Sequence, residues 1–265
     1  MSIITLTTDF GLEDGFIGSM KGVIWGICPE AKIADISHAV SPQNVLEGAY
    51  ILRRAYSYFP AGTVHVAVVD PGVGTARRPL AARLGQHLFI APDNGLLTPI
   101  LEQAEQNGWP VKFFHANNQD YWLPGISHTF HGRDIFAPLG AHLAGGVPLS
   151  DLGAAIHDPV RLDLPKPEKT PSGWRAHVTF IDHFGNLATD LPAAALTGAN
   201  NDETVFLLGK YTVHGLVTSY GYKKTGELVA MINSENYLEI AIVNGSAAQV
   251  LGAKVGDIVE VIFES

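Results

Sequence analysis

The period of the hydrophobic pattern changes along this chain, and the change limits the folds that the chain can adopt. Up to about residue 160, short apolar runs of strand length alternate with longer segments of helical period. Beyond residue 173 only short runs bounded by turn residues occur. Strands separated by helices predict an α/β layer with a largely parallel central sheet, and closely spaced short strands predict a smaller all-β domain, barrel-like or a compact sandwich. We therefore predict two domains of different structural class.

The expected elements can be placed by residue range. In the first domain, strands are predicted at 3–6, 33–36, 63–69 and 88–91, and helices at 16–27 and 45–58. In the second domain, strands are predicted at 176–182, 204–208, 228–232, 238–243 and 258–263. Gly18 and Gly22 in the first helix are expected to be small contact positions.

A segment rich in proline and charge separates the two patterns. Residues 158–171 read DPVRLDLPKPEKTP and have no period that fits a helix or a strand. We predict an N-terminal α/β domain over residues 1–160, a linker over 161–173 and a C-terminal barrel-like β domain over 174–265.

Charge and hydropathy exclude several classes of partner. The formal net charge of −9 does not suit a protein that neutralises phosphates, so no nucleic-acid partner is expected. No apolar stretch approaches the roughly 18 to 20 residues that span a bilayer, and the N-terminus lacks the basic region of a signal peptide, so we expect a soluble, cytoplasmic protein without membrane attachment. The single cysteine, Cys28, excludes an internal disulfide and is expected to be a packing residue.

Polar clusters follow the predicted strands, where an open α/β sheet binds its ligands. Asp9 lies in the middle of the TTDFG segment after the first strand, and Asp70 opens DPGVGT after the third. Arg77 lies seven residues after Asp70 and could fold back to hold its carboxylate ionised. The glycines of DPGVGT allow the backbone to approach a ligand closely. Because the Walker lysine and hydroxyl are missing and the dinucleotide fingerprint is incomplete, neither kind of phosphate site is expected.

The remaining candidate residues stand in three further motifs. His131 in FHGRDIF lies near a helix N-terminus, which favours its neutral form. Asp182, Phe184 and Asn186 in IDHFGN combine an acid, an aromatic ring and an amide, which suit a nucleoside. Ser234 and Gly245, in INS and VNGS, bracket a strand. Taken singly, these residues also fit ordinary caps, turns and structural histidines.

Six motifs occur in order over nearly the whole chain: TTDFG, DPGVGT, APDNGLLTP, FHGRDIF, IDHFGN and INSENYLEIAIVNGSA. Together they resemble the adenosine-forming S-adenosyl-L-methionine hydrolases, also called SAM hydroxide adenosyltransferases, which are similar in fold to fluorinase and chlorinase. The resemblance implies hydrolysis of S-adenosyl-L-methionine to adenosine and L-methionine, without a cofactor or metal. It also implies a homotrimer whose active sites lie at subunit interfaces.

The resemblance further implies a role for each candidate residue. The hydrolase triad corresponds to Asp70, Arg77 and His131, which would orient and deprotonate a water for in-line attack on the ribose C5′ carbon. Asp70 and His131 both stay open as the base. The residues that would bind substrate are Asp9 for the ribose hydroxyls, Asp182 and Ser234 for the methionine portion, Phe184 and Asn186 for the adenine, and Gly245 for backbone contacts to the base.

The chain departs from the halogenating relatives at several of these positions. Halogenases carry a tyrosine and a serine where this chain has Asp70 and Gly132, so the small halide pocket is expected to be absent and halogenation is disfavoured. They also carry a tryptophan where Gln43 stands and an arginine where Glu235 stands.

Two other functions stay open. A metal-dependent hydrolase could use Asp9, Asp70, His131 and Asp134 as ligands, although no HExxH-like pair supports it. Alternatively, the chain could be a module that binds adenosine or its sulfonium precursor without turnover.

Overall fold

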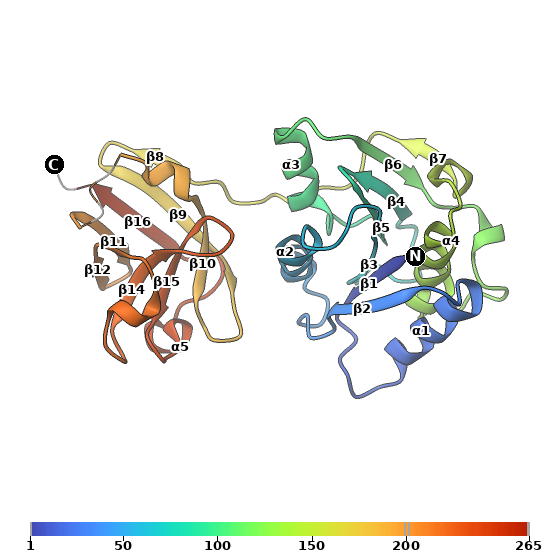
Figure 1. The fold of residues 1–265 in the computed structure, drawn as a ribbon, viewed down its shortest axis with the longest axis horizontal. Coiled ribbons are helices and arrows are strands. Elements are labelled where there is room, and N and C mark those ends of the chain that lie inside the picture. Colours follow the sequence, from blue (N-terminus) through green and yellow to red (C-terminus); the bar gives the residue numbers. More distant parts are fainter. Residues whose placement is uncertain (1, 199, 201, 264–265) are drawn as a thin grey trace. The chain divides into compact units, whose positions relative to one another are not determined.

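The computed structural model describes residues 2–198, 200 and 202–263, and it divides the chain into two compact units, Met1–Asp163 and Leu164–Ser265 (Figure 1). The N-terminal unit contains strands β1 (Ile3–Thr8), β2 (Lys32–Ser37), β3 (Val64–Val68), β4 (Pro79–Leu84), β5 (His87–Pro92), β6 (Val111–His115) and β7 (Ala154–Ile156). Its helices are α1 (Phe16–Ile27), α2 (Val45–Tyr56), α3 (Thr98–Gln106) and α4 (Ala137–Ala144), with short helical turns η1 (Gln119–Tyr121), η2 (Gly132–Phe136) and η3 (Leu149–Asp151).

The strands of the N-terminal unit form one sheet in the order β2-β1-β3-β5-β4-β6-β7. The neighbours β2, β1, β3 and β5 run parallel, whereas β4 is antiparallel to both β5 and β6. The predicted α/β class is confirmed, but the sheet is mixed rather than largely parallel, because the pairs β5-β4, β4-β6 and β6-β7 are antiparallel. The parallel strands β1 and β3 lie side by side, with Thr8 opposite Val68, so the residues that follow them emerge at the same edge.

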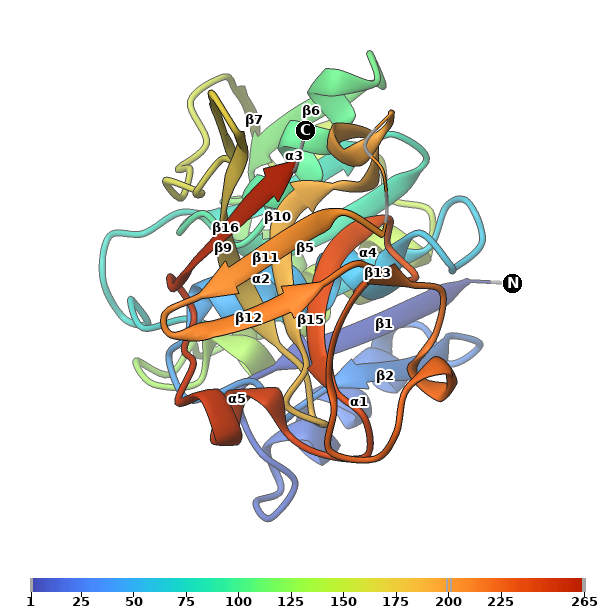
Figure 2. The same cartoon turned by 90° about the vertical axis from the view of Figure 1, so that its left-hand side faces the viewer.

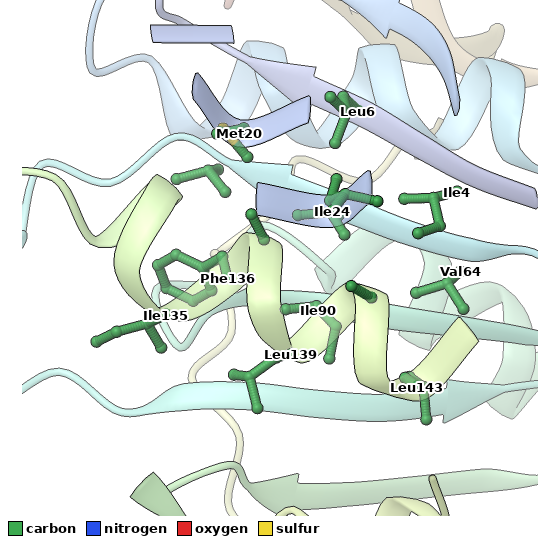
Figure 3. Packing of buried hydrophobic residues seen from close by; sticks show 14 of the residues in the cluster. Ile4, Leu6, Met20, Ile24, Val64, Ile90, Ile135, Phe136, Leu139 and Leu143 are labelled. Carbon is green, nitrogen blue, oxygen red and sulfur yellow. The ribbon is translucent and has the colours of Figure 1, made fainter. Parts of the chain in front are cut away.

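Helices cover both faces of this sheet. Ile17, Met20 and Ile24 recur at helical spacing on α1 and are buried against α4 and the sheet, as Figure 3 shows for Met20 and Ile24 beside Ile4, Leu6 and Phe136. On the opposite face, α2 and α3 pack against one another. The side chain of Asn44 caps α2 by accepting from the backbone N–H of Glu47 at 3.1 Å, which satisfies one donor of the first turn.

The C-terminal unit is almost entirely β structure. It contains β8 (Glu168–Thr170), β9 (Gly173–Ile181), β10 (Leu187–Pro192), β11 (Thr204–Leu208), β12 (Tyr211–His214), β13 (Leu216–Val217), β14 (Leu228–Ile232), β15 (Tyr237–Ile242) and β16 (Ile258–Phe263), with α5 (Ala247–Leu251) and turns η4 (Ala193–Leu196) and η5 (Tyr220–Tyr222). The main order is β12-β11-β16-β9-β10-β15-β14-β13, and Figure 2 shows the hairpin of β11 and β12. Because β12 also contacts β14, the sheet curls into the barrel-like form that was predicted.

Three sequence expectations differ from the structure in detail. The segment predicted as a linker contains β8, which pairs with β9, and three residues are too few to show a period. Gly18 and Gly22 lie on the exposed side of α1 with no atom near the position of a Cβ, so their prediction as contact positions is wrong. Strands such as β4 and β10 were not predicted, because their apolar runs are short.

None of the described helices is long and apolar enough to cross a bilayer.

Candidate active site

The first candidate site is built where β1 and β3 end. Asp9 directly follows β1, and Asp70 comes two residues after β3. Because these strands are parallel neighbours, the two carboxylates lie at the same edge of the sheet. The structure therefore confirms that the first and third strand ends lie together.

Arg77 lies at the centre of this site. Its Nε donates to both carboxylate oxygens of Asp70, at 3.0 and 2.9 Å, and its Nη2 donates to Asp70 Oδ2 as well. The guanidinium carbon lies 4.9 Å from the centroid of the Phe136 ring, which packs beneath it. Both side chains are largely removed from water, with 9% of Arg77 and 5% of Asp70 exposed. Burial of this kind strengthens the pair and fixes its geometry.

His131 completes the cluster from another element. It stands at the N-cap of η2, the π-helical turn that leads into α4, and its Nδ1 lies 2.7 Å from Arg77 Nη2. An arginine can only donate, so Nδ1 is the acceptor, and a neutral His131 carries its proton on Nε2. Burial, together with the neighbouring Arg77 charge, lowers the pKa of His131 below its ordinary value. His131 is therefore neutral near pH 7, with an N–H to offer.

Close backbone contacts hold the loops of this site together. Gly74 has a φ of +77°, and a Cβ there would lie 2.7 Å from the carbonyl oxygen of His128, so the loop after β3 requires glycine at this point. A Cβ on Gly132 would lie 2.9 Å from the ring of Phe10. The turn that carries Asp9 thus packs against the turn that carries His131.

Asp9 is oriented by a strained loop. Its Oδ2 accepts a hydrogen bond from the backbone N–H of Gln43 at 2.8 Å, and Gln43 has a φ of +65°, which is uncommon for a residue other than glycine. Asp9 Oδ1 makes no hydrogen bond within the described part of the chain. One oxygen of the carboxylate is therefore held and the other is open to a ligand.

Asp134 takes no part in this cluster. Its carboxylate accepts from the backbone N–H of Ser127 at 2.8 Å and from Arg133 Nε at 2.6 Å. Burial favours the protonated form, but these hydrogen bonds prevail and hold the pKa of Asp134 below its ordinary value. Asp134 braces the loop before His131. Among the described residues, no group of three or more acidic, histidine or cysteine side chains is arranged to hold a metal ion.

The C-terminal unit carries a second set of candidate residues in the turn between β9 and β10. Asp182 Oδ1 accepts from the backbone N–H groups of Phe184 and Asn186, both at 2.9 Å, and Oδ2 accepts from the Asn186 amide at 2.9 Å. Phe184, in the middle of this turn, is 73% exposed. Since a carboxylate only accepts, the Asn186 NH2 group faces Asp182, and its Oδ1 points elsewhere without a partner in the described residues.

A chain of hydrogen bonds extends from Asn186 to residues that the sequence analysis missed. Asn186 Nδ2 also donates to the hydroxyl of Tyr220 at 3.4 Å, and that hydroxyl donates to Glu239 Oε1 at 2.6 Å. Glu239 is 3% exposed and has no cationic partner in the described residues, although Asn233 Nδ2 lies 3.5 Å from its other oxygen. A lone acid inside the apolar strand YLEIAI was a signal that could have identified Glu239. No local pattern marks Tyr220.

Gly245 and Ser234 lie in the turns at the two ends of β15, and only Gly245 is beside this set. A Cβ on Gly185 would lie 2.0 Å from Ser246 Oγ, so the Asp182 turn packs directly against the turn that contains Gly245. Ser234 is exposed in the turn between β14 and β15, next to Asn233. The structure thus brings Asp182, Phe184, Asn186 and Gly245 to one end of the barrel-like sheet, whereas Ser234 lies at the other end of β15.

The fold and the Arg77-centred cluster define a two-domain enzyme with an α/β unit and an all-β unit. The N-terminal domain of the SAM hydroxide adenosyltransferase family matches residues 4–153, and the C-terminal domain of that family matches residues 176–260. The chain belongs to this family.

Named relatives and a solved structure agree with this assignment. The chain is 40% identical over 256 residues to an (R)-S-adenosyl-L-methionine hydrolase of Salinispora tropica, covering 96% of this chain and 95% of the relative. It is 33% identical to a fluorinase of Actinoplanes sp., covering 90% of each protein. The crystal structure of an uncharacterized conserved protein from Thermotoga maritima superposes with a TM-score of 0.91 at 36% identity, covering 98% of this chain and 99% of the other.

Proposed function

We propose that this protein hydrolyses S-adenosyl-L-methionine to adenosine and L-methionine by in-line attack of water on the ribose C5′ carbon. The observation that carries the proposal is the position of Arg77, hydrogen-bonded at once to Asp70 and to His131 at the edge of the sheet. Membership of the SAM hydroxide adenosyltransferase family supports it.

The chemistry requires positioning more than acid catalysis. The sulfonium is already a good leaving group, so the enzyme has to hold a water opposite the sulfur at attack distance. Such orientation contributes several kcal/mol, on the order of the effective-molarity gain of an intramolecular reaction. In the step, a C5′–O bond forms, the C5′–S bond breaks, and its electron pair returns to the sulfur of methionine.

The hydrogen bonds of the cluster suit the two candidate bases, His131 and Asp70, to different roles. Because His131 Nδ1 accepts from Arg77, its Nε2–H is suited to donate to the water oxygen and cannot take a proton. We therefore assign the proton acceptor to Asp70, whose carboxylate has lone pairs left beside the Arg77 bonds. The proton that the water loses passes to Asp70 and then to solvent.

The same geometry supports the substrate contacts. The open Oδ1 of Asp9 can accept from a ribose hydroxyl, and Asn186 Oδ1 can accept from the exocyclic amine of adenine. The exposed ring of Phe184 offers a stacking face. We assign Asp182 and Ser234 to the methionine portion and the backbone at Gly245 to the base. The homotrimer with active sites at subunit interfaces and the cytoplasmic location stay predictions, the first testable by light scattering.

An isotope experiment tests the reaction. The purified protein is incubated with S-adenosyl-L-methionine in oxygen-18 water, with and without chelator, and the products are identified by mass. We expect adenosine that carries one heavy oxygen, and methionine that carries none. Adenosine formed only without chelator would favour the metal-dependent hydrolase, and binding without any product would favour the binding module.

Two neighbouring arginines give a matched control for the role of the cluster. Arg77→Lys keeps the charge but loses the two-pronged contact with Asp70, whereas Arg78→Lys changes an arginine that pairs with Asp93 and Asp158 instead. We expect Arg77→Lys to lose turnover and Arg78→Lys to retain it. Equal losses in both variants would remove the Arg77-centred cluster from the mechanism.

A further inference from the structure

A buried histidine outside the Arg77-centred cluster contacts the turn that carries Asp9. His38 follows β2 and is only 4% exposed. Its carbonyl oxygen accepts from the backbone N–H of Gly11 at 2.9 Å, and its Nδ1 lies 2.8 Å from Thr8 Oγ1. Thr8 Oγ1 in turn accepts from the backbone N–H of Phe10 at 3.2 Å. His38 thus meets the 8–11 turn on both sides of Asp9.

The far side of the His38 ring faces an ion pair. Nε2 lies 3.1 Å from Asp35 Oδ1, which is an ion-pair distance although the angle is not that of a good hydrogen bond. Lys21 Nζ lies 2.7 Å from the other oxygen of Asp35. Burial raises the pKa of Asp35, but Lys21 and His38 outweigh it and hold that pKa below its ordinary value.

These contacts determine which atom donates and which accepts in the hydrogen bonds that run from His38 through Thr8 to Phe10. The Asp35 carboxylate favours a proton on His38 Nε2, which leaves Nδ1 of the neutral ring as an acceptor. The hydroxyl of Thr8 then donates to Nδ1, and its lone pair is free to accept from Phe10 N–H. On the other side of the turn, Gln43 N–H holds Asp9 Oδ2. The segment from His38 to Gln43 therefore holds the Asp9 turn at three points.

We propose that His38 is a positioning residue for substrate binding, which acts through Thr8 to hold the Asp9 carboxylate where it meets the ribose hydroxyls. The inference rests on the proposed function, since Asp9 is assigned to the ribose there. His38 itself touches no substrate. Its removal should therefore weaken the contact to the sugar hydroxyls and leave the Arg77-centred cluster unchanged.

The test compares two probes on the full chain. Calorimetry gives the Kd of adenosine and of 2′,3′-dideoxyadenosine, which lacks both ribose hydroxyls, and the ratio of the two values isolates the sugar contact. We expect the wild type to prefer adenosine by about tenfold or more, the scale of one hydrogen bond to a charged group. His38→Ala should lose most of this preference, and KM should rise with kcat little changed.

Two conservative variants separate positioning from simple support of the fold. In His38→Asn the amide oxygen occupies roughly the place of Nδ1 and should restore the preference, whereas in His38→Gln the amide reaches only toward Asp35 and should not. Thermal unfolding is measured for each variant. A preference that stays at the wild-type ratio in His38→Ala, whatever its melting temperature, would overturn the inference.

Asp9→Ala distinguishes this failure from failure of the proposed function. If Asp9→Ala abolishes the preference and His38→Ala does not, only the role of His38 is wrong. If Asp9→Ala leaves the preference intact, or the wild type has none, the assignment of Asp9 to the ribose is wrong, and the inference about His38 falls with it.

Discussion

The polar sets of the two units are held in place by different physical means. In the N-terminal unit, one guanidinium lies between a carboxylate and a neutral imidazole, and nearly all of it is buried. In the C-terminal unit, the Asn186 amide is held between Asp182 and the hydroxyl of Tyr220, which in turn meets Glu239, and no cation takes part among the described residues. The first arrangement is suited to positioning a nucleophilic water. The second is suited to ligand recognition, because it holds the Asn186 amide in one orientation.

The difference also appears in what each set exposes. The Arg77-centred cluster offers little surface beyond the open side of its acceptors and the His131 N–H, whereas the C-terminal turn exposes the aromatic side chain of Phe184 and buries Asn186. Substitutions in the N-terminal set should therefore change kcat, and those in the C-terminal set should change KM. Of the predictions that follow, two test this division directly and two test histidines of the N-terminal unit, in order from the largest expected effect to the smallest.

The largest effect is expected for Arg77→Lys. An ammonium cannot hold Asp70 through two nitrogens and reach His131 at once, so kcat should fall on the order of 100-fold while KM changes by less than about threefold. Steady-state kinetics with S-adenosyl-L-methionine measure both values. A large rise in KM at constant kcat would assign Arg77 to binding and remove the contrast between the two units.

The second prediction concerns stability of the N-terminal unit in acid. His65 is fully buried beside Thr5 and His87, and burial lowers its pKa from 6.5 to about 3. Below pH 6.5 the unfolded chain binds a proton at His65 that the folded chain does not bind. The contribution of His65 to the free energy of unfolding is therefore fully present above pH 6.5 and is lost as the pH falls toward 3. The loss should reach about 2 kcal/mol at pH 5.

Calorimetry at pH 7 and pH 5 checks this value. Because burial also lowers the pKa of His87, its contribution has the same sign. His65→Gln is the control, since the variant should lose most of the pH dependence between 6.5 and 5. A wild-type transition that does not move over this range would contradict the buried, neutral state of His65.

The third prediction concerns the hydrogen bonds around Asn186 in the C-terminal unit. Tyr220→Phe removes the hydroxyl between Asn186 and Glu239, so the amide loses one of its two anchors and the Glu239 carboxylate loses its short hydrogen bond. We expect KM to rise by several-fold to about tenfold with kcat nearly constant. Tyr222→Phe is the matched control, because Tyr222 is 73% exposed and lies outside this chain of bonds. An equal effect of the two substitutions would argue against a role in substrate binding for the hydrogen bonds that join Asn186, Tyr220 and Glu239.

The smallest expected effect is the response of activity to mild acid. Since burial and Arg77 lower the pKa of His131 below its ordinary value of 6.5, the neutral ring predominates near pH 7. Accordingly, the fall of kcat/KM in acid should have its midpoint below pH 6.5, as protonation of the ring disrupts the bond from Arg77. A midpoint of activity at or above 6.5 would contradict this environment.

Sequence patterns predicted local structure well where one period dominates. The helix from Phe16 to Ile27 was placed at its observed bounds, because its buried residues repeat at helical spacing. Strands β4 and β10 were missed because a short run in a mixed or curled sheet has no distinctive period. Asp70, Arg77 and His131 could be named from motifs, but their hydrogen bonds could not, because 54 residues separate Arg77 from His131.

The sequence by itself determined the two structural classes, the order of the motifs and the identities of the groups that can do chemistry, because these depend on local periodicity and residue type. Only the tertiary structure decided which nitrogen of His131 faces Arg77, which way the Asn186 amide is turned, and that Glu239 and His38 stand behind the candidate residues. The direction of a hydrogen bond depends on which donor and acceptor meet in space, and residues distant in sequence meet only when the chain folds.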